Sequence, residues 1–390
     1  MKPLNPAITS RPTTIFTVMS ALAAECGAIN LGQGFPDTDG PRDVRQKAAE
    51  IALDGPNQYP PMPGSPELRQ AVAAANARFY GLDVDWREQV LVTSGGTEAL
   101  AAAAMAFLCP GDEAVVIEPA YDAYFEQIAM AGATARPVAL SAGGPQPWRL
   151  DVEALATAFG PKTKAIFVNS PLNPVGRVFD EGELAAIAEL CVRHDVIAIC
   201  DEVYEHLTFD GARHVPLMTL PGMAERTVRI GSAGKTFSLT GWKVGYATGA
   251  APLIRAMAQA HQYLTFTTPP NLQLAIAYGL GKDESYFTGL ASDMQAKRDR
   301  LAAGLTSAGF DILPAEGTYF LTADISGLSG ESDAEFCKTI TREARVAAIP
   351  ISAFYHPQSQ PPRRYVRFCF CKQDAVLDEA AARLRAWTGR

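Results

Sequence analysis

Two lysines, the hydroxyl of Ser232 and four glycines occur between residues 231 and 246 (GSAGKTFSLTGWKVGY). The β-branched run TVRI (227–230) precedes them and predicts a buried strand. Lys235 then lies on a tight turn at the carboxyl end of that strand, which is the edge of an α/β sheet where ligands bind. Lys243 follows between glycines, whose backbone can approach a ligand closely. These residue types suit an anionic ligand that carries an electrophilic carbon.

A nucleotide phosphate loop is the first alternative, because Gly234-Lys235-Thr236 is similar to the end of such a loop. That motif requires a glycine five positions before the Gly-Lys pair, where this chain has Arg229. An acidic strand end, VIAICDE (196–202), precedes the lysine segment, which reverses the usual order in phosphate-loop enzymes. We therefore reject the nucleotide interpretation. A surface turn that merely contains a lysine remains open unless other segments supply partners.

Other predicted strands also end in groups that a ligand could use. Gly96 and Thr97 follow VLVTS (90–94) and offer free backbone N–H groups at a helix N-terminus, which can bind a phosphate. Asp201 follows the apolar run VIAIC (196–200). An ionised carboxylate at that position costs several kcal/mol unless a cation meets it.

Asn173 lies on the proline-rigid turn PLNP (171–174), and Tyr204 follows Asp201 by three residues. Each of these residues alone has an ordinary structural explanation, such as a helix cap, a turn or a salt bridge. Together they match one ligand with a phosphate, a protonated ring nitrogen, a phenolic oxygen and an aldehyde. That ligand is pyridoxal phosphate, which forms a Schiff base with a lysine and needs an acidic partner at its pyridinium nitrogen.

Composition excludes several other classes of protein. The chain has 390 residues, a formal charge of −8 and no basic run, which argues against nucleic acid as a partner. Its seven cysteines are odd in number and scattered, so we expect neither a disulfide framework nor a metal site. We expect the protein to reside in a reducing compartment, the cytoplasm. Ile15 to Ala24 could pass for the apolar part of a secretory signal, but its apolar residues recur at helical spacing. No apolar run approaches the roughly 20 residues that span a bilayer, so we expect no membrane association.

From about residue 88 the chain alternates between apolar strands and helices, which predicts an α/β fold with a mainly parallel sheet covered on both faces. An amphipathic stretch over 283–308 then leads into a smaller α/β unit with strands at 317–324 and 364–370. We predict an N-terminal arm and helix (1–40) that joins the small domain, a large cofactor-binding domain (41–285) and a small C-terminal domain (286–390).

Along nearly its whole length the chain resembles the class I pyridoxal-phosphate aminotransferases of fold type I. Within that family it is most similar to the branch of methionine aminotransferases and kynurenine aminotransferases (glutamine transaminase K). The matching stretches are INLGQGFPD (29–37), TSGGTEAL (93–100), EPAYDAY (118–124), NSPLNPVGRVF (169–179), DEVYEHL (201–207), SAGKTFSLTGWKVGY (232–246), HQYLTF (261–266) and RFCF (367–370).

The resemblance implies the roles of the cofactor site. Lys235 would form the Schiff base and carry the proton from the substrate's Cα, while Asp201 would pair with the pyridinium nitrogen. Asn173 and Tyr204 would hydrogen-bond the phenolic oxygen, and Tyr121 would stack on the ring. The phosphate would be held by Gly96, Thr97, Ser232 and Lys243.

Three further points concern the residues around the Schiff-base lysine, the assembly and the backbone. Many relatives have serine before the Schiff-base lysine and arginine in place of Lys243, whereas this chain has Gly234 and Lys243, as in the kynurenine and methionine branch. Tyr59 would reach the phosphate of a neighbouring subunit, which requires a homodimer. Cis peptide bonds are expected before Pro119 and Pro174.

The strand RYVRFCF (364–370) places Arg367 among apolar residues, where a cation is costly unless an anion meets it. The fork of an arginine fits a carboxylate, and an internal ion pair is the alternative. By resemblance the anion is the substrate's α-carboxylate, helped by Gly34 and Asn173. Phe16 would line the side-chain pocket together with Phe266 of the partner subunit, and Phe354 and Tyr355 are further candidates for this wall.

We therefore predict an aminotransferase that moves an amino group from a sulfur-containing or aromatic amino acid to a 2-oxo acid. Methionine, phenylalanine, tyrosine, kynurenine and glutamine are the expected donors. Cysteine-conjugate β-lyase activity on the same scaffold is the alternative. A regulator that binds the cofactor without catalysis is disfavoured, because the short N-terminal region leaves no room for a DNA-binding domain.

Overall fold

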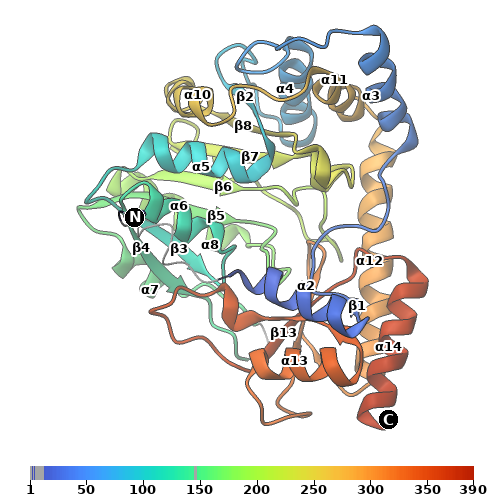
Figure 1. Cartoon of the computed structure of the whole chain (residues 1–390). Coiled ribbons are helices and arrows are strands. Elements are labelled where there is room, and N and C mark those ends of the chain that lie inside the picture. The colour runs from blue at the N-terminus through green and yellow to red at the C-terminus, as the bar shows by residue number, and fades with distance from the viewer. Residues whose placement is uncertain (1, 3, 5–12, 145–146) are drawn as a thin grey trace.

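The computed structural model describes residues 2, 4, 13–144 and 147–390, and within them a large sheet runs through the middle of the molecule (Figure 1). This sheet has seven strands in the order β2-β8-β7-β6-β5-β3-β4. Their bounds are β2 (Val90–Thr93), β3 (Glu113–Glu118), β4 (Thr134–Ala139), β5 (Thr163–Asn169), β6 (Ile197–Asp201), β7 (Thr227–Ser232) and β8 (Gly245–Gly249). All neighbouring strands are parallel except β8, which is antiparallel to β2 and β7. The predicted mainly parallel α/β sheet is confirmed.

Helices cover both faces of this sheet, as the unbroken apolar strands predicted. In β5, Ile166 and Val168 pack into one core, whereas Ala165 and Phe167 pack into the other. The helices on the first face are α7 (Val152–Ala158) and α8 (Glu181–His194), and those on the second are α5 (Gly95–Phe107), α6 (Ala123–Met130) and α10 (Ala251–Leu264). At the β2 edge a further core is built by α3 (Arg42–Asp54), α4 (Pro66–Tyr80) and α11 (Pro270–Leu280).

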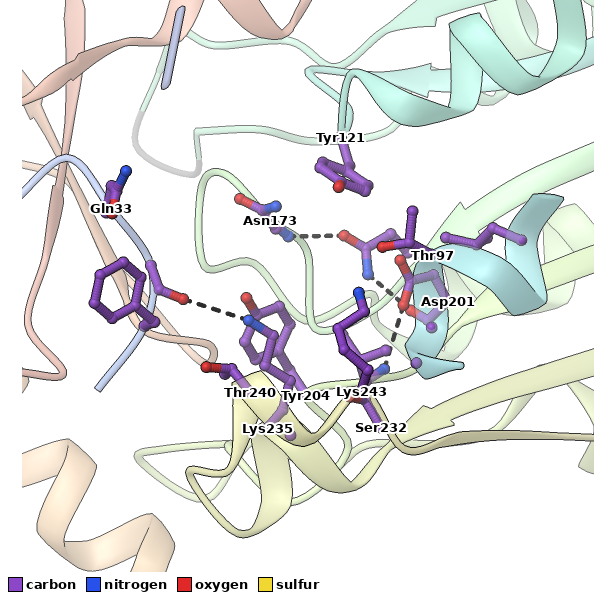
Figure 2. Close-up of a pocket in the computed structure, with 18 of the residues that line it drawn as sticks. Gln33, Thr97, Tyr121, Asn173, Asp201, Tyr204, Ser232, Lys235, Thr240 and Lys243 are labelled. Carbon is purple, nitrogen blue, oxygen red and sulfur yellow. Dashed lines mark hydrogen bonds between the residues drawn. The ribbon is translucent and has the colours of Figure 1, made fainter. Parts of the chain in front are cut away.

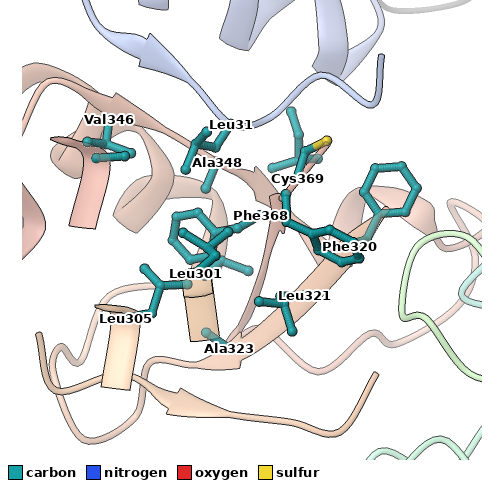
Figure 3. Close-up of a cluster of buried hydrophobic side chains, with 14 of the residues drawn as sticks. Leu31, Leu301, Leu305, Phe320, Leu321, Ala323, Val346, Ala348, Phe368 and Cys369 are labelled. Carbon is teal, nitrogen blue, oxygen red and sulfur yellow. The ribbon is translucent and has the colours of Figure 1, made fainter. Parts of the chain in front are cut away.

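A smaller antiparallel sheet with the order β12-β13-β10-β9 forms a second layer. Its strands are β9 (Asp311–Ile312), β10 (Phe320–Asp324), β12 (Ile349–Pro350) and β13 (Tyr365–Cys369), and its helices are α12 (Glu284–Ser307), α13 (Asp333–Glu343) and α14 (Asp374–Thr388). Figure 3 shows Leu301 and Leu305 of α12 in one buried cluster with Leu321 and Phe368. The helix predicted over 283–308 is therefore confirmed as α12.

The start of the described chain packs against this smaller layer. The helix α2 (Ile15–Cys26) buries Met19 in the same cluster, and β1 (Ile29–Asn30) pairs in parallel with β11 (Val346–Ala347). The apolar run that could pass for a secretory signal thus forms a packed helix. The arm predicted before it lies mostly outside the described residues, and the domain boundaries at 40 and 285 stay a prediction. No helix in the described ranges has both the length and the hydropathy to cross a bilayer.

The register of the large sheet aligns the strand ends that carry polar groups. Asn169 at the end of β5 pairs with Asp201 at the end of β6. Asp201 in turn pairs with Ile230 of β7, two residues before Ser232. The strand β8 was not predicted, because its glycines were interpreted only as ligand-binding backbone. The strand β8 places Gly245 between Ser232 of β7 and Thr93 of β2. The segment with Lys235 and Lys243 therefore meets the N-terminus of α5.

Candidate active site

One pocket of about 450 Å³ lies at the carboxyl edge of the large sheet, and the smaller layer contributes to its wall (Figure 2). It brings together twelve of the residues predicted for the site: Phe16, Gly34, Gly96, Thr97, Tyr121, Asn173, Asp201, Tyr204, Ser232, Lys235, Lys243 and Arg367. Figure 2 shows Asp201, Thr97, Ser232 and Lys243 toward one end and Gln33 toward the other, with Asn173 and Lys235 between them.

Asp201 is a buried carboxylate, with only 6% of the residue exposed. Its Oδ2 accepts a hydrogen bond from the Tyr124 hydroxyl (2.6 Å), and its Oδ1 accepts one from the Val203 N–H (3.4 Å). Burial raises the pKa of Asp201, because desolvation disfavours the charged form. No Lys, Arg or His nitrogen of the described chain forms an ion pair with it. The carboxylate can therefore accept a strong hydrogen bond from a cationic ligand group.

Lys235 lies in the short helix α9 (Ala233–Thr236), directly after β7. Its Nζ donates to the Gly34 carbonyl (3.3 Å) and lies 5.4 Å from the ring centroid of Tyr204. The Tyr319 hydroxyl donates to the Lys235 carbonyl (2.8 Å) and fixes the backbone at this turn. Burial lowers the pKa of Lys235, which increases the share of neutral, nucleophilic amine.

The N-terminus of α5 forms the opposite wall of this end of the pocket. The first N–H groups of a helix have no partner within the helix and point at a bound anion. Gly95 opens α5 with φ = 75°, and Lys243, also with positive φ (54°), packs beside it. A Cβ on Gly245 would lie 2.6 Å from the Gly95 carbonyl carbon, so only glycine lets β8 approach the helix start this closely.

Arg367 is a buried cation at the other end of the pocket, with 1% of the residue exposed. One terminal nitrogen donates to Asn173 Oδ1 (2.9 Å) and the other to the Gly32 carbonyl (2.6 Å), while Nε has no partner in the described chain. Three phenyl rings surround the guanidinium, with centroids 3.9 to 5.3 Å away: Phe320, Phe354 and Phe16.

Burial lowers the pKa of Arg367 to about 10. No carboxylate of the described residues pairs with it, so the alternative of an internal ion pair is not found. A buried cation with no anion is costly, and a carboxylate that enters the pocket removes that cost. Arg367 can therefore bind a carboxylate in a pocket with little water, where the attraction between the two charges is strong.

Ion pairs outside the pocket stabilise the turn that carries Asp201 and Tyr204. Glu202 and Glu205 do not line the pocket, and they pair with Arg229 of β7 at 2.6 Å and 2.9 Å. All three side chains are nearly fully buried. This ion-pair network ties the turn to the strand that leads to Lys235, so the two parts of the site keep a fixed relative position.

Sequence reasoning missed several pocket residues, and only some had a detectable signal. Asn169 could have been found, because it ends β5 as Asp201 ends β6; it accepts the Asn173 N–H (2.8 Å) and donates to the Asp201 carbonyl (2.7 Å). Tyr124, which donates to Asp201 but does not line the pocket, had no spacing signal. Phe320 and Gln33 come from distant parts of the chain and enter the pocket only through tertiary packing.

The backbone expectations hold, with one addition. Cis peptide bonds precede Pro119 and Pro174 as predicted, and a further one precedes Pro171. Tyr59 and Phe266 do not line the pocket of their own chain. They are 83% and 40% exposed and pack edge to face at 5.5 Å. Their predicted roles need a second subunit and stay predictions.

Comparison with known proteins identifies the family. The sequence matches the family described as aminotransferase class I and II over residues 27–384. A Mycobacterium tuberculosis protein named probable N-succinyldiaminopimelate aminotransferase is 48% identical over 379 residues, which cover 95% of each chain. The methionine aminotransferase of Escherichia coli is 41% identical over 374 residues, which cover 96% of this chain and 95% of the relative. The solved M. tuberculosis structure superposes with a TM-score of 0.95 at 47% identity, over 99% of this chain and 100% of that one.

This chain belongs to the class I and II aminotransferase family. It is a fold type I enzyme that uses pyridoxal phosphate to move an amino group between an amino acid and a 2-oxo acid. The pocket fits that cofactor on independent grounds. It holds a buried carboxylate without a cation, a lysine of lowered pKa and a helix N-terminus within one cavity.

The contact between β8 and α5 gives a test of the phosphate end. Gly245→Ala adds a Cβ 2.6 Å from the Gly95 carbonyl carbon and 2.8 Å from the Gly96 nitrogen, so the helix start must shift. We expect the affinity for pyridoxal phosphate to fall by about tenfold or more, measured by absorbance titration of the apoenzyme. Gly241→Ala is the control, because its Cβ meets nothing within 4 Å. Equal affinities in the two variants would contradict a phosphate site at this helix.

Proposed function

We propose that the enzyme takes its amino group from a sulfur-containing or aromatic amino acid, namely methionine, phenylalanine, tyrosine, kynurenine or glutamine. The observation that supports this is the wall of phenyl rings around Arg367. Among the described pocket residues the only cations are Lys235, Lys243 and Arg367. If Arg367 binds the α-carboxylate, no cation is left for a carboxylate on the substrate's side chain, which disfavours aspartate.

The bound cofactor supplies an electrophilic carbon and an electron sink. We assign its ring nitrogen to Asp201, whose buried carboxylate keeps that nitrogen protonated. Asn173 and Tyr204 are assigned to the phenolic oxygen, and Tyr121 to the face of the ring. Gly96, Thr97, Ser232 and Lys243 hold the phosphate in this proposal.

Two groups of the chain act on the substrate in this proposal. Lys235 Nζ takes the proton from the substrate's Cα, and its lowered pKa raises the share of neutral amine that can act as the base. Arg367 orients the substrate by its α-carboxylate, with Asn173 and the backbone of Gly34 beside it. The phenyl rings exclude water from this contact, which strengthens it.

We further propose a cytoplasmic homodimer. Tyr59, Tyr263, Leu264 and Phe266 are exposed apolar or aromatic side chains on neighbouring segments, which is typical of an interface. Tyr59 would then reach the phosphate of the partner's site, and Phe266 would complete its side-chain pocket. None of the seven cysteines forms a disulfide, which supports a reducing compartment.

N-succinyldiaminopimelate is a second candidate donor, because the 48% identical M. tuberculosis relative carries that name. Its distal carboxylates would need cationic partners beyond Arg367. Cysteine-conjugate β-lyase activity remains a third possibility, because elimination uses the same cofactor and the same lysine.

A panel of amino donors tests the proposed substrate class. We expect the cofactor's absorption to change with methionine, kynurenine, phenylalanine and glutamine at a kcat/KM about tenfold or more above that of aspartate. Faster turnover of aspartate would contradict the proposal, and faster turnover of N-succinyldiaminopimelate would replace it with the second candidate. Release of pyruvate and ammonia from a cysteine conjugate without an acceptor would reveal the lyase.

Mixing two inactive variants tests the shared site. Lys235→Ala removes the proposed base, and Tyr59→Ala removes the side chain that we assign to the partner's phosphate. A heterodimer of the two has one site with both residues intact. After joint refolding we expect about a quarter of the wild-type activity, because random association makes half the dimers mixed. If each subunit's site were complete by itself, the mixture would show only the average of the two variants.

A further inference from the structure

Gln33 provides an amide at the substrate end of the pocket. The residue lines the cavity together with Phe16, Phe35 and Phe320. Figure 2 shows it far from Asp201, with Asn173 between them. Arg367 donates to the carbonyl of Gly32, the residue before Gln33, so the substrate's proposed carboxylate site lies beside this segment. It is therefore placed to meet a substrate's side chain rather than the cofactor.

The segment that carries Gln33 is held by a small hydrogen-bond network. Asn30 Oδ1 accepts the N–H groups of Gly32 (2.9 Å) and Gln33 (3.3 Å), which fixes the orientation of the Asn30 amide. Its Nδ2 then donates to the Ser20 hydroxyl oxygen (3.2 Å). That same oxygen accepts the Gln33 Nε2 at 2.5 Å.

This network leaves one polar atom of Gln33 for a ligand. Nε2 donates to Ser20, whereas Oε1 has no hydrogen-bond partner in the described chain; it is not fully buried, and the residue lines the cavity. A carbonyl oxygen accepts hydrogen bonds and cannot donate them. Ser20 holds the side-chain amide of Gln33, and Asn30 holds Ser20 and the Gln33 backbone N–H, so a substrate does not have to order the amide on binding.

We propose that Gln33 determines specificity by accepting a hydrogen bond from an N–H group at the end of the substrate's side chain. This inference rests on the proposed function and narrows its substrate class. It favours donors that end in a primary amide, an aromatic amine or an N-acyl amide, such as glutamine and kynurenine. Methionine and phenylalanine would contact the same apolar side chains, but they have no side-chain N–H group to donate to Oε1. A site built for a hydrogen bond discriminates against an analogue that lacks it.

Glutamine and methionine form a matched pair for the test, because their side chains have similar length and only glutamine has an N–H donor. Gln33→Met removes the amide and keeps an unbranched side chain of similar size. We expect the ratio of kcat/KM for glutamine to kcat/KM for methionine to fall by about tenfold in this variant. Methionine sulfoxide, which offers an acceptor and no donor, should show no such fall relative to methionine.

The control is Gln46→Met, the same substitution at an exposed site on α3. Its glutamine-to-methionine ratio should equal that of the wild type. Ser20→Ala, which frees the Gln33 amide to turn, should lower the ratio by an intermediate factor.

An unchanged ratio in Gln33→Met would overturn the inference. An equal fall for methionine sulfoxide would also overturn it, because the amide would then present its nitrogen to the substrate. Both results are distinct from a failure of the proposed function, in which the wild-type enzyme itself would turn over neither methionine nor glutamine.

Discussion

The site is organised around two buried charges that have no ionic partner in the described protein. Asp201 is a carboxylate whose direct contacts are a tyrosine hydroxyl and a backbone N–H, and Arg367 is a guanidinium held by an amide and a carbonyl among three phenyl rings. Burying an unpaired charge opposes folding, so the rest of the structure must stabilise both. What completes them comes from outside the chain. The cofactor's ring nitrogen suits the first charge, and the substrate's carboxylate suits the second.

The fold delivers these charges to one cavity through two separate devices. The parallel strands of the large sheet end at a common edge, where register places Asn169 beside Asp201. The smaller antiparallel sheet brings Arg367 in from a strand far along the chain. The ion-pair network of Arg229 with Glu202 and Glu205 stabilises the turn that carries Asp201 and Tyr204. Lys235 lines the same cavity as both charges, and burial lowers its pKa, so more of its amine is neutral and able to react.

Much of the cofactor end could be predicted from the sequence, because strand ends in a parallel sheet converge by rule. Lys235, Asp201, Ser232 and Thr97 were found in this way, and the structure brings them together. The role of Arg367 could be predicted because burying an unpaired guanidinium inside an apolar strand costs free energy, so an anion must meet it.

The remainder depends on contacts that have no local pattern. Gly245 lets β8 pack against the start of α5, and the sequence shows this glycine without the contact. Phe320 and Gln33 reach the pocket, and Tyr124 reaches Asp201, only through packing between distant segments. Substrate choice belongs to the same category, and a relative named for N-succinyldiaminopimelate was not anticipated.

The central claim is that Asp201 is completed by the cofactor's ring nitrogen. The most direct measurement compares the affinity of the apoenzyme for pyridoxal phosphate and for an analogue with C–H in place of that nitrogen. We predict that the wild type prefers the natural cofactor by about tenfold or more and that Asp201→Ala loses this preference. An equal preference in the two proteins would contradict the account.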